Sequence, residues 1–237
     1  ITQGPLVEKF EKKISKLVEC KYATAVNSST SGLHVACLAM GLKKNDHLWT
    51  VPNTFVASAN CGRFCGAKID FVDIDIKTLN ICNKELLKKL VKAKKEKKLP
   101  KIIVIVHFAG NPCNLIQIKK LSIKYGFKII EDASHALGSF YKKKPIGNCK
   151  YSDATVFSFH PVKPITTCEG GVVTTNSLKF KNSMDLFRNH GIVKDHKNFV
   201  QNNYEPWKYE QQFLGYNYRM NEIQAALGIS QLKKIKK

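Results

Sequence analysis

A run of five β-branched residues stands near the middle of the chain, and it reads Ile102-Ile103-Val104-Ile105-Val106. Such a run without polar interruption is typical of a strand buried on both faces of a parallel sheet. A strand with only one buried face would alternate apolar and polar residues. Segments with helical periodicity lie on either side, at 83–98 and 115–125. We therefore predict a central sheet with helices packed on it.

The alternation of strand and helix continues outward to both ends of the chain. Further strands are expected at 22–26, 48–51, 68–72, 128–130, 154–157 and 171–174. Further helices are expected at 6–18, 33–42, 54–64 and 178–189, and from about Met220 to the end. Asn53 or Thr54 is expected to cap the helix at 54–64. A Tyr-, Asn- and Gln-rich loop is expected over about 196–212. The order predicts a doubly wound α/β domain with a mostly parallel sheet.

The extent of the chain leads to two expectations, one about its domain and one about its ends. Residues 1–237 are expected to form one large domain that includes the N-terminal helix. The first residue, Ile1, is not Met, and the last helical pattern is still running at Lys237. We therefore expect the chain to be truncated at both ends.

The formal net charge of +21 raises the question of a nucleic-acid partner. Almost all of the excess is Lys, because Arg63, Arg188 and Arg219 are the only arginines. Proteins that read nucleic acids rely on Arg, whereas these lysines gather on predicted helices, as at 83–98. We predict no nucleic-acid partner. No run of about 18 apolar residues is present, so no membrane span is predicted.

The eight cysteines are scattered, and none forms a C-x-x-C pair. A zinc ribbon is therefore not expected, and we predict no metal site. Cys37, Cys61 and Cys65 lie in apolar, helix-like stretches, where a free cysteine packs as a small apolar side chain. The interpretation that we favour is reduced thiols in a cytoplasmic protein, rather than a disulfide framework.

Ligands of parallel α/β sheets gather at the carboxyl ends of the strands, and four segments of this chain are predicted to lie there. The first is Ser28-Ser29-Thr30-Ser31-Gly32. Its backbone N–H groups, its hydroxyls and the following helix N-terminus suit a phosphate. A plain helix cap is an equally good interpretation of this segment alone.

The second segment, Glu131-Asp132-Ala133-Ser134-His135, follows an apolar strand. A carboxylate buried there needs a cation or a protonated ring nitrogen as its partner. His135 could bind the same ligand. The alternatives are a helix cap for the acidic residues and a buried, hydrogen-bonded core histidine.

The third segment contains Lys163 between Pro161 and Pro164. Such a lysine in a rigid, irregular segment can act as a nucleophilic amine when it is desolvated, although an ordinary surface lysine is the alternative. The fourth is Gly170-Gly171, which permits a close backbone approach or marks a simple turn.

In this order and spacing, the segments resemble the DegT/DnrJ/EryC1/StrS family of sugar aminotransferases, which have the fold-type I pyridoxal-phosphate fold. The resemblance begins at Thr2-Gln3-Gly4-Pro5 and extends to the final helix. It is carried by the segments 27–33, 131–138, 158–163, 169–171 and 214–221. It implies that this chain is the large, cofactor-binding domain and that the family's small C-terminal domain is missing.

The resemblance also implies residue roles. Lys163 corresponds to the Schiff-base lysine of pyridoxal 5′-phosphate, and Asp132 to the partner of the pyridine nitrogen. Phe55 corresponds to the aromatic residue stacked on the ring, and His135 to the residue near its phenolic oxygen. The implied phosphate ligands are Thr30, Ser31, Ser158 and, from the partner subunit, Asn217. A homodimer with shared sites follows from that last role.

The implied reaction is transfer of an amino group from glutamate to the C4 ketone of a nucleotide-linked 4-keto-6-deoxy sugar. Segments 158–167 and 210–217 look most like family members of pseudaminic acid biosynthesis, with a UDP-linked sugar. Alternatives are a perosamine- or bacillosamine-type substrate, or a catalytically silent sensor. Some family members are dehydratases with His in place of the lysine, but here Lys163 is present and His160 is a separate residue. Cys168 stands where the family favours Gly or Ala.

Overall fold

The computed structural model describes residues 4–200 and 205–235. Thr2, Gln3, Lys236 and Lys237 therefore lie outside the described residues. A seven-stranded sheet forms the centre, in the order β1-β9-β8-β5-β4-β2-β3. Its strands are β1 (Tyr22–Val26), β2 (His47–Thr50), β3 (Lys68–Phe71), β4 (Ile102–Val106), β5 (Lys128–Asp132), β8 (Ala154–Ser158) and β9 (Gly171–Thr175).

Only β9 runs against the other strands of this sheet. It pairs antiparallel with β1 and with β8, whereas β8, β5, β4, β2 and β3 pair in parallel along the sheet. The prediction of a mostly parallel sheet is thus confirmed. The register places Val106 opposite Asp132 and Asp132 opposite Val156, so the carboxyl ends of three central strands meet at one edge.

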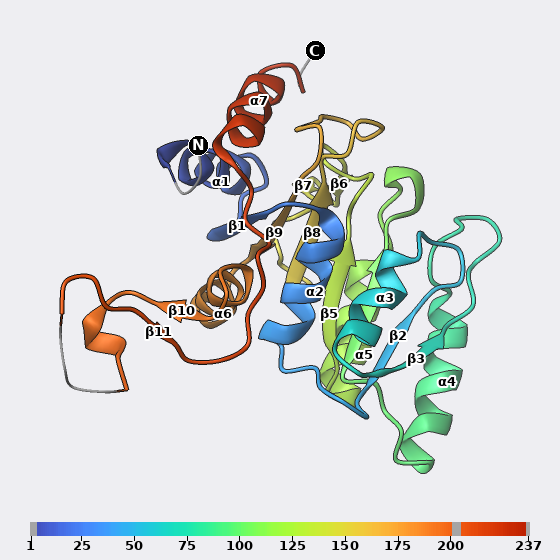
Figure 1. The fold of residues 1–237 in the computed structure, drawn as a ribbon. Helices are drawn as coiled ribbons and strands as arrows, with labels where there is room; N and C mark the ends of the chain where they lie inside the picture. Colours follow the sequence, from blue (N-terminus) through green and yellow to red (C-terminus); the bar gives the residue numbers. More distant parts are fainter. Residues whose placement is uncertain (1–3, 201–204, 236–237) are drawn as a thin grey trace.

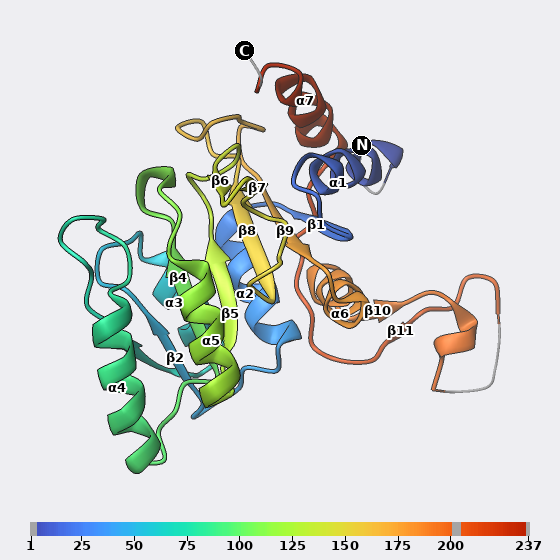
Figure 2. The ribbon, with the colours of Figure 1, turned by 180° about the vertical axis from the view of Figure 1, so that it is seen from behind.

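Helices cover both faces of the sheet (Figures 1 and 2). On one face, α2 (Ser29–Ala39), α3 (Ala57–Phe64) and α6 (Leu178–Arg188) contribute to one apolar cluster. On the other, α1 (Pro5–Leu17), α4 (Asn83–Lys95), α5 (Leu115–Tyr125) and α7 (Glu222–Leu232) contribute to a second. Because β4 sends Ile102 and Val104 into the first cluster and Ile103 and Ile105 into the second, its uninterrupted apolar run is explained.

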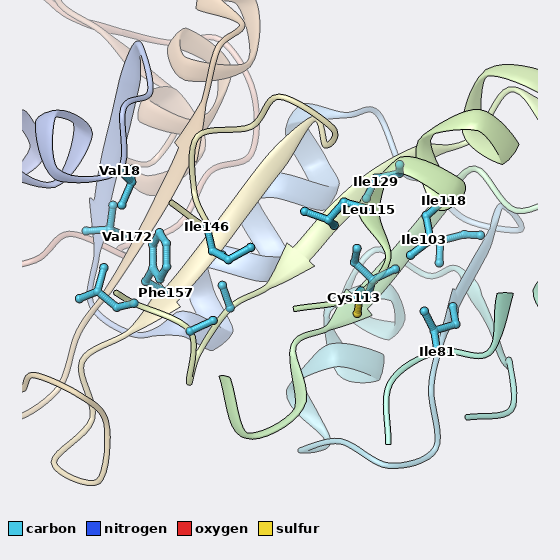
Figure 3. Close-up of a cluster of buried hydrophobic side chains, with 14 of the residues drawn as sticks. Val18, Ile81, Ile103, Cys113, Leu115, Ile118, Ile129, Ile146, Phe157 and Val172 are labelled. Atoms are coloured by element: carbon cyan, nitrogen blue, oxygen red, sulfur yellow. The ribbon is translucent and has the colours of Figure 1, made fainter. Parts of the chain in front are cut away.

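Figure 3 shows part of the second cluster, where Leu115 and Ile118 of α5 lie near Ile103 and Ile129 of the sheet. Ile103, Ile118 and Ile129 are at most 1% exposed. Full burial of a side chain of this size contributes about 1.5–3 kcal/mol, so this layer is a large part of what holds the strand ends in place.

The first and last helices pack against each other beside β1, and both described ends of the chain lie there (Figure 1). Glu222 at the start of α7 accepts hydrogen bonds from Leu6 N at 2.9 Å and Val7 N at 3.2 Å. It thereby caps the N-terminal end of α1, whose own cap residue, Gly4, offers no side chain.

Four predicted helix boundaries are wrong by three or more residues. The helix expected at 33–42 already begins at Ser29, because Ser28 caps it, and it ends at Ala39. The helix expected from Thr54 begins at Ala57 without a side-chain cap, because Thr54 Oγ1 bonds to Ser58 Oγ at 2.8 Å instead of to a backbone N–H. The helix expected over 83–98 ends at Lys95, where Lys97 adopts a positive φ of 56°.

Several short elements were not predicted. The expected loop near 196–212 is entered and left through the strands β10 (Ile192–Val193) and β11 (Glu210–Gln211), with the one-turn helix η2 (His196–Asn198) between them. The hairpin of β6 (Phe140–Tyr141) and β7 (Lys144–Pro145) and the one-turn helix η1 (Phe108–Gly110) complete the fold. Among the described helices, none has both the length and the apolar character needed to cross a bilayer.

Candidate active site

A cavity of about 650 Å³ opens at the carboxyl ends of β4, β5 and β8, where the sequence placed its candidate residues. Six of the predicted site residues line it: Thr30, Phe55, Asp132, His135, Ser158 and Lys163. They come from four separate strand-to-helix or strand-to-strand connections, which the parallel sheet brings to one edge.

Two predicted residues do not line this cavity. Ser31 is buried behind it, and its hydroxyl donates to Asn27 Oδ1 at 2.6 Å. Asn217 lies on the exposed connection before α7, where its carbonyl accepts a 3.4 Å hydrogen bond from Asn27 Nδ2. A single chain therefore does not bring Asn217 into its own cavity.

The Asp132 carboxylate is 6% exposed and faces the cavity. Ser58 Oγ donates to its Oδ2 at 2.6 Å, and Ser134 donates to its Oδ1 through its hydroxyl at 2.7 Å and its backbone N–H at 3.2 Å. Within the described part of the chain, Asp132 forms no ion pair, unlike most buried carboxylates. The carboxylate thus has hydrogen-bond donors on one side, has no countercharge among the described residues, and lines the cavity.

The neighbouring carboxylate, Glu131, is committed elsewhere. It bonds to His107 Nε2 at 2.7 Å and accepts hydrogen bonds from Ser152 and, at 3.0 Å, Thr155. His107 Nδ1 accepts from Cys113 N at 3.1 Å, so the imidazole proton lies on Nε2 and points at Glu131. The two acidic residues therefore have different roles: Glu131 forms hydrogen bonds within the fold, whereas Asp132 lines the cavity.

Lys163 and His135 meet in the cavity with 2.6 Å between Nζ and Nε2. Burial and the charge of Lys163 lower the pKa of His135, and the nearby Asp132 opposes them. The imidazole is therefore neutral at pH 7, and its Nε2 accepts a hydrogen bond from Lys163 Nζ. The loop that carries Lys163 is closed at its base by Phe159 N bonding to Gly170 O and by Thr167 N bonding to Phe159 O, both at 2.9 Å.

The N-terminal end of α2 faces the same cavity through Ser28, Ser29 and Thr30. Ser28 Oγ accepts from Ser31 N at 3.1 Å, so the interpretation as a helix cap holds alongside any role in ligand binding. Gly171 packs directly beneath this turn: a β-carbon added there would lie 2.6 Å from Ser28 C and Ser29 N. The predicted close backbone approach at Gly171 is confirmed.

Phe55 forms part of the cavity wall, and its side chain is 74% exposed in this chain.

Two residues at the site, Ser58 and His107, were not predicted from the sequence. Ser58 sits one helical turn after Thr54, and no motif marks it. His107 follows the apolar run of β4 directly, and its place at a strand end was a usable signal.

A cavity at strand ends that joins a lysine, a neutral imidazole and a buried unpaired carboxylate is what the sequence resemblance leads one to expect. The family model for the DegT/DnrJ/EryC1/StrS aminotransferase family matches residues 1–237. The chain belongs to this family.

Individual relatives agree with the family assignment. The chain is 42% identical over 235 residues to a UDP-4-amino-4,6-dideoxy-N-acetyl-beta-L-altrosamine transaminase of Campylobacter jejuni, and the match covers 99% of this chain and 58% of the relative. Among solved structures, it is similar to Helicobacter pylori PseC, an aminotransferase involved in the biosynthesis of pseudoaminic acid. That likeness has a TM-score of 0.86 at 36% identity and covers 99% of this chain and 59% of the other.

A third likeness is to the PLP-form of a putative sugar aminotransferase, Spr1654, from Streptococcus pneumoniae. It has a TM-score of 0.84 at 25% identity and covers 100% of this chain and 61% of that one. The chain thus spans about three fifths of the length of the proteins it matches.

Proposed function

We propose that the protein is an aminotransferase that uses pyridoxal 5′-phosphate, bound in the 650 Å³ cavity, to aminate a nucleotide-linked keto sugar. The observation that carries the proposal is the buried Asp132 carboxylate, which forms no ion pair with any described residue and lines the same cavity as Lys163. Asp132 would bind a protonated pyridine nitrogen of the cofactor, which would bring the positive charge that balances the carboxylate. The family and the named relatives support the same reaction class.

The residues present fit this cofactor. The N-terminal end of α2, with Thr30, and the Ser158 hydroxyl offer donors for a phosphate. Asp132 would bind the ring nitrogen, Phe55 would cover the ring, and Lys163 would attach covalently through Nζ. The cofactor, when bound, supplies an electron sink that stabilises negative charge on the carbon losing its proton.

The chain's own contribution is to orient groups and move a proton. Ser58 and Ser134 donate hydrogen bonds to Asp132 and so orient the carboxylate toward the position of the ring nitrogen. When Lys163 Nζ is not attached to the cofactor, it would be the base in the cavity that takes up and returns a proton. His135 accepts a hydrogen bond from Nζ and so fixes where that base points.

For the substrate, we propose a UDP-linked 4-keto-6-deoxy-N-acetylhexosamine aminated at C4, with glutamate as amino donor and pseudaminic acid as the pathway. The sugar named for the Campylobacter relative and the pathway named for the Helicobacter enzyme support this choice. Perosamine- or bacillosamine-type sugars are the alternative substrates. A silent sensor is disfavoured because the cavity retains both Lys163 and Asp132.

The test uses the full-length protein, loaded with pyridoxal 5′-phosphate and offered glutamate with a panel of UDP-, GDP- and TDP-linked 4-keto sugars. Mass spectrometry should find the amino sugar from the UDP-linked N-acetyl substrate together with 2-oxoglutarate. Amination of a different sugar would reject the substrate but keep the reaction class. Failure to bind the cofactor, measured by absorbance after gel filtration, would reject the reaction class.

A further inference from the structure

Six ionisable side chains line the cavity of the candidate active site. Four of them are engaged with the partners described above, namely His107, Asp132, His135 and Lys163. The two that remain are His160 and Glu169. They lie on either side of Lys163 in the sequence, on the loop that carries this lysine. Their use in the cavity is therefore still open.

Hydrogen bonds hold the backbone of both residues in place. The His160 carbonyl accepts from Lys163 N at 3.0 Å. The Glu169 carbonyl accepts from Thr167 Oγ1 at 2.8 Å and from Gln224 Nε2 at 2.7 Å. The two side chains are therefore presented to the cavity from fixed positions, as a preorganised binding site requires.

Neither side chain has a hydrogen-bond partner among the described residues. His160 Nε2 lies 3.8 Å from Glu169 Oε1, which is longer than a hydrogen bond. The two side chains are 49% and 58% exposed in a single chain. An exposed pair of this kind adds little to stability, so both groups are available to a ligand in the cavity.

The spacing of these two atoms suits one hydroxyl group. A hydroxyl oxygen can lie about 2.8 Å from each of two atoms that are 3.8 Å apart. The Glu169 carboxylate only accepts hydrogen bonds, whereas the His160 imidazole with its proton on Nε2 donates one. A hydroxyl both donates and accepts, so it satisfies both groups at once. A ketone or carboxylate oxygen has no proton to give to Glu169.

We propose that Glu169 and His160 bind the hydroxyl on the carbon next to the keto carbon of the sugar, which presupposes the proposed aminotransferase function. The keto carbon reacts at Lys163, and the pair lines the same cavity on the same loop. In a 4-keto-6-deoxy sugar, the neighbours of the keto carbon are C3, which carries a hydroxyl, and C5, which carries a methyl group. The hydroxyl that the pair binds is therefore the one on C3.

The amino donor fits the same two residues poorly. Its α-carboxylate lies on the reacting carbon itself, so it would approach the Glu169 carboxylate, and like charges at short range repel each other. Glu169 thus stabilises binding of the sugar and contributes nothing to binding of glutamate. The two half-reactions should therefore respond differently when Glu169 is replaced.

The first experiment measures binding rather than turnover. Full-length protein loaded with pyridoxamine 5′-phosphate is titrated by calorimetry with UDP-4-amino-4,6-dideoxy-N-acetyl-beta-L-altrosamine and with its 3-deoxy counterpart. The unaltered protein should bind the sugar that carries the hydroxyl about tenfold or more tightly. Most of this preference should disappear in Glu169→Ala, because the hydroxyl loses its acceptor. His160→Phe, which removes the donor, should reduce the preference as well.

The matched control is Glu85→Ala. Glu85 is an exposed carboxylate on α4 that pairs with Lys88 and lies outside the cavity lining. This variant should keep the full preference for the hydroxyl. A preference that is the same in Glu169→Ala as in the unaltered protein, or a failure of both sugars to bind, would overturn the proposed sugar contact.

The second experiment separates this contact from the proposed function. Stopped-flow absorbance follows the half-reaction with glutamate and the half-reaction with the keto sugar one at a time. Glu169→Ala should react with glutamate at a near-normal rate and should lose about tenfold or more in the second-order rate with the sugar. Equal losses in both half-reactions would indicate a structural role and contradict the contact. An unaltered protein that neither binds the cofactor nor reacts with glutamate would instead reject the proposed function.

Discussion

Adjacent carboxylates on β5 differ in what they bind, and this difference separates function from stability at single residues. Glu131 is 2% exposed and has three hydrogen-bond partners in the fold, whereas Asp132 has two serine partners and an open side toward the cavity. Removing the charge from each should therefore change different measurements.

Asp132→Asn should leave cofactor binding largely intact and lower the rate of the half-reaction with glutamate by about 100-fold or more. The amide fills the same space but cannot hold a proton on the ring nitrogen. Stopped-flow absorbance measures this rate. Glu131→Gln is the matched control: it should lower the free energy of unfolding by about 1–3 kcal/mol because a buried acceptor loses its charge. A near-normal half-reaction rate in Asp132→Asn would remove Asp132 from its role.

The lowered pKa of His135 leads us to predict how the rate of the glutamate half-reaction depends on pH. Its pKa is lowered below the ordinary value of 6.5, so the neutral imidazole that accepts from Lys163 persists through pH 7 and is lost only as the pH falls below 6.5. The rate of the glutamate half-reaction should accordingly hold down to about pH 6.5 and decline beneath it. In His135→Gln, which cannot titrate, that acidic decline should be absent. A decline of the same midpoint in both proteins would assign it to another group.

At the scale of elements, the apolar periodicity predicted nearly every large helix and strand, because the pattern of apolar residues follows which side chains are buried. Ile102 to Val106 is the clearest case. Helix starts were predicted less well, because they depend on single hydrogen bonds. Thr54 bonds to Ser58, which in turn donates to Asp132, a residue distant in sequence.

The candidate site was predicted in the same uneven way. Residues in local motifs, such as Asp132 and Lys163, reached the cavity, whereas Ser58 comes from a helix that carries no motif. The reversal of β9 was also not predictable from periodicity, because a buried strand reads the same in either direction. Short hairpins such as that of β6 and β7 bury too little to leave a pattern.

Gly171 links two elements and provides a prediction at this scale. A methyl group added on β9 would press on the backbone at Ser28 and Ser29, where α2 begins. Gly171→Ala should therefore shift the start of α2, weaken binding of pyridoxal 5′-phosphate by about tenfold or more, and cost about 1–3 kcal/mol in stability. Equilibrium titration and urea unfolding measure the two effects.

The control for this variant is Gly126→Ala, at the C-terminal end of α5, where an added β-carbon meets nothing within 4 Å. Its positive φ of 80° makes it destabilising as well, but it lies outside the cavity lining. Comparable cofactor affinity in the two variants would show that the approach of Gly171 to α2 does not shape the site.

For the whole molecule, the rim of the cavity points to a second subunit. Phe55 and Val162, which line the cavity, are 74% and 75% exposed, so part of the cavity wall in a single chain is made of exposed apolar side chains. Exposed apolar groups gathered in this way are typical of interaction sites. The exposed Asn217, which does not reach its own cavity, is free to serve that of a partner.

We predict that the active protein is a homodimer whose two sites are shared across the interface. Twofold symmetry would bring Asn217 of each chain to the phosphate of the other chain's cofactor. A hydrogen bond to a charged group is worth about 1.5–3 kcal/mol, so Asn217→Ala should weaken cofactor binding about tenfold or more. The decisive measurement mixes full-length Lys163→Ala subunits with Asn217→Trp subunits, each inactive alone. In the mixed dimer one site collects both defects and the other has none, so activity should return in part. If subunit exchange is demonstrated by mass and activity stays absent, each site is built from one chain.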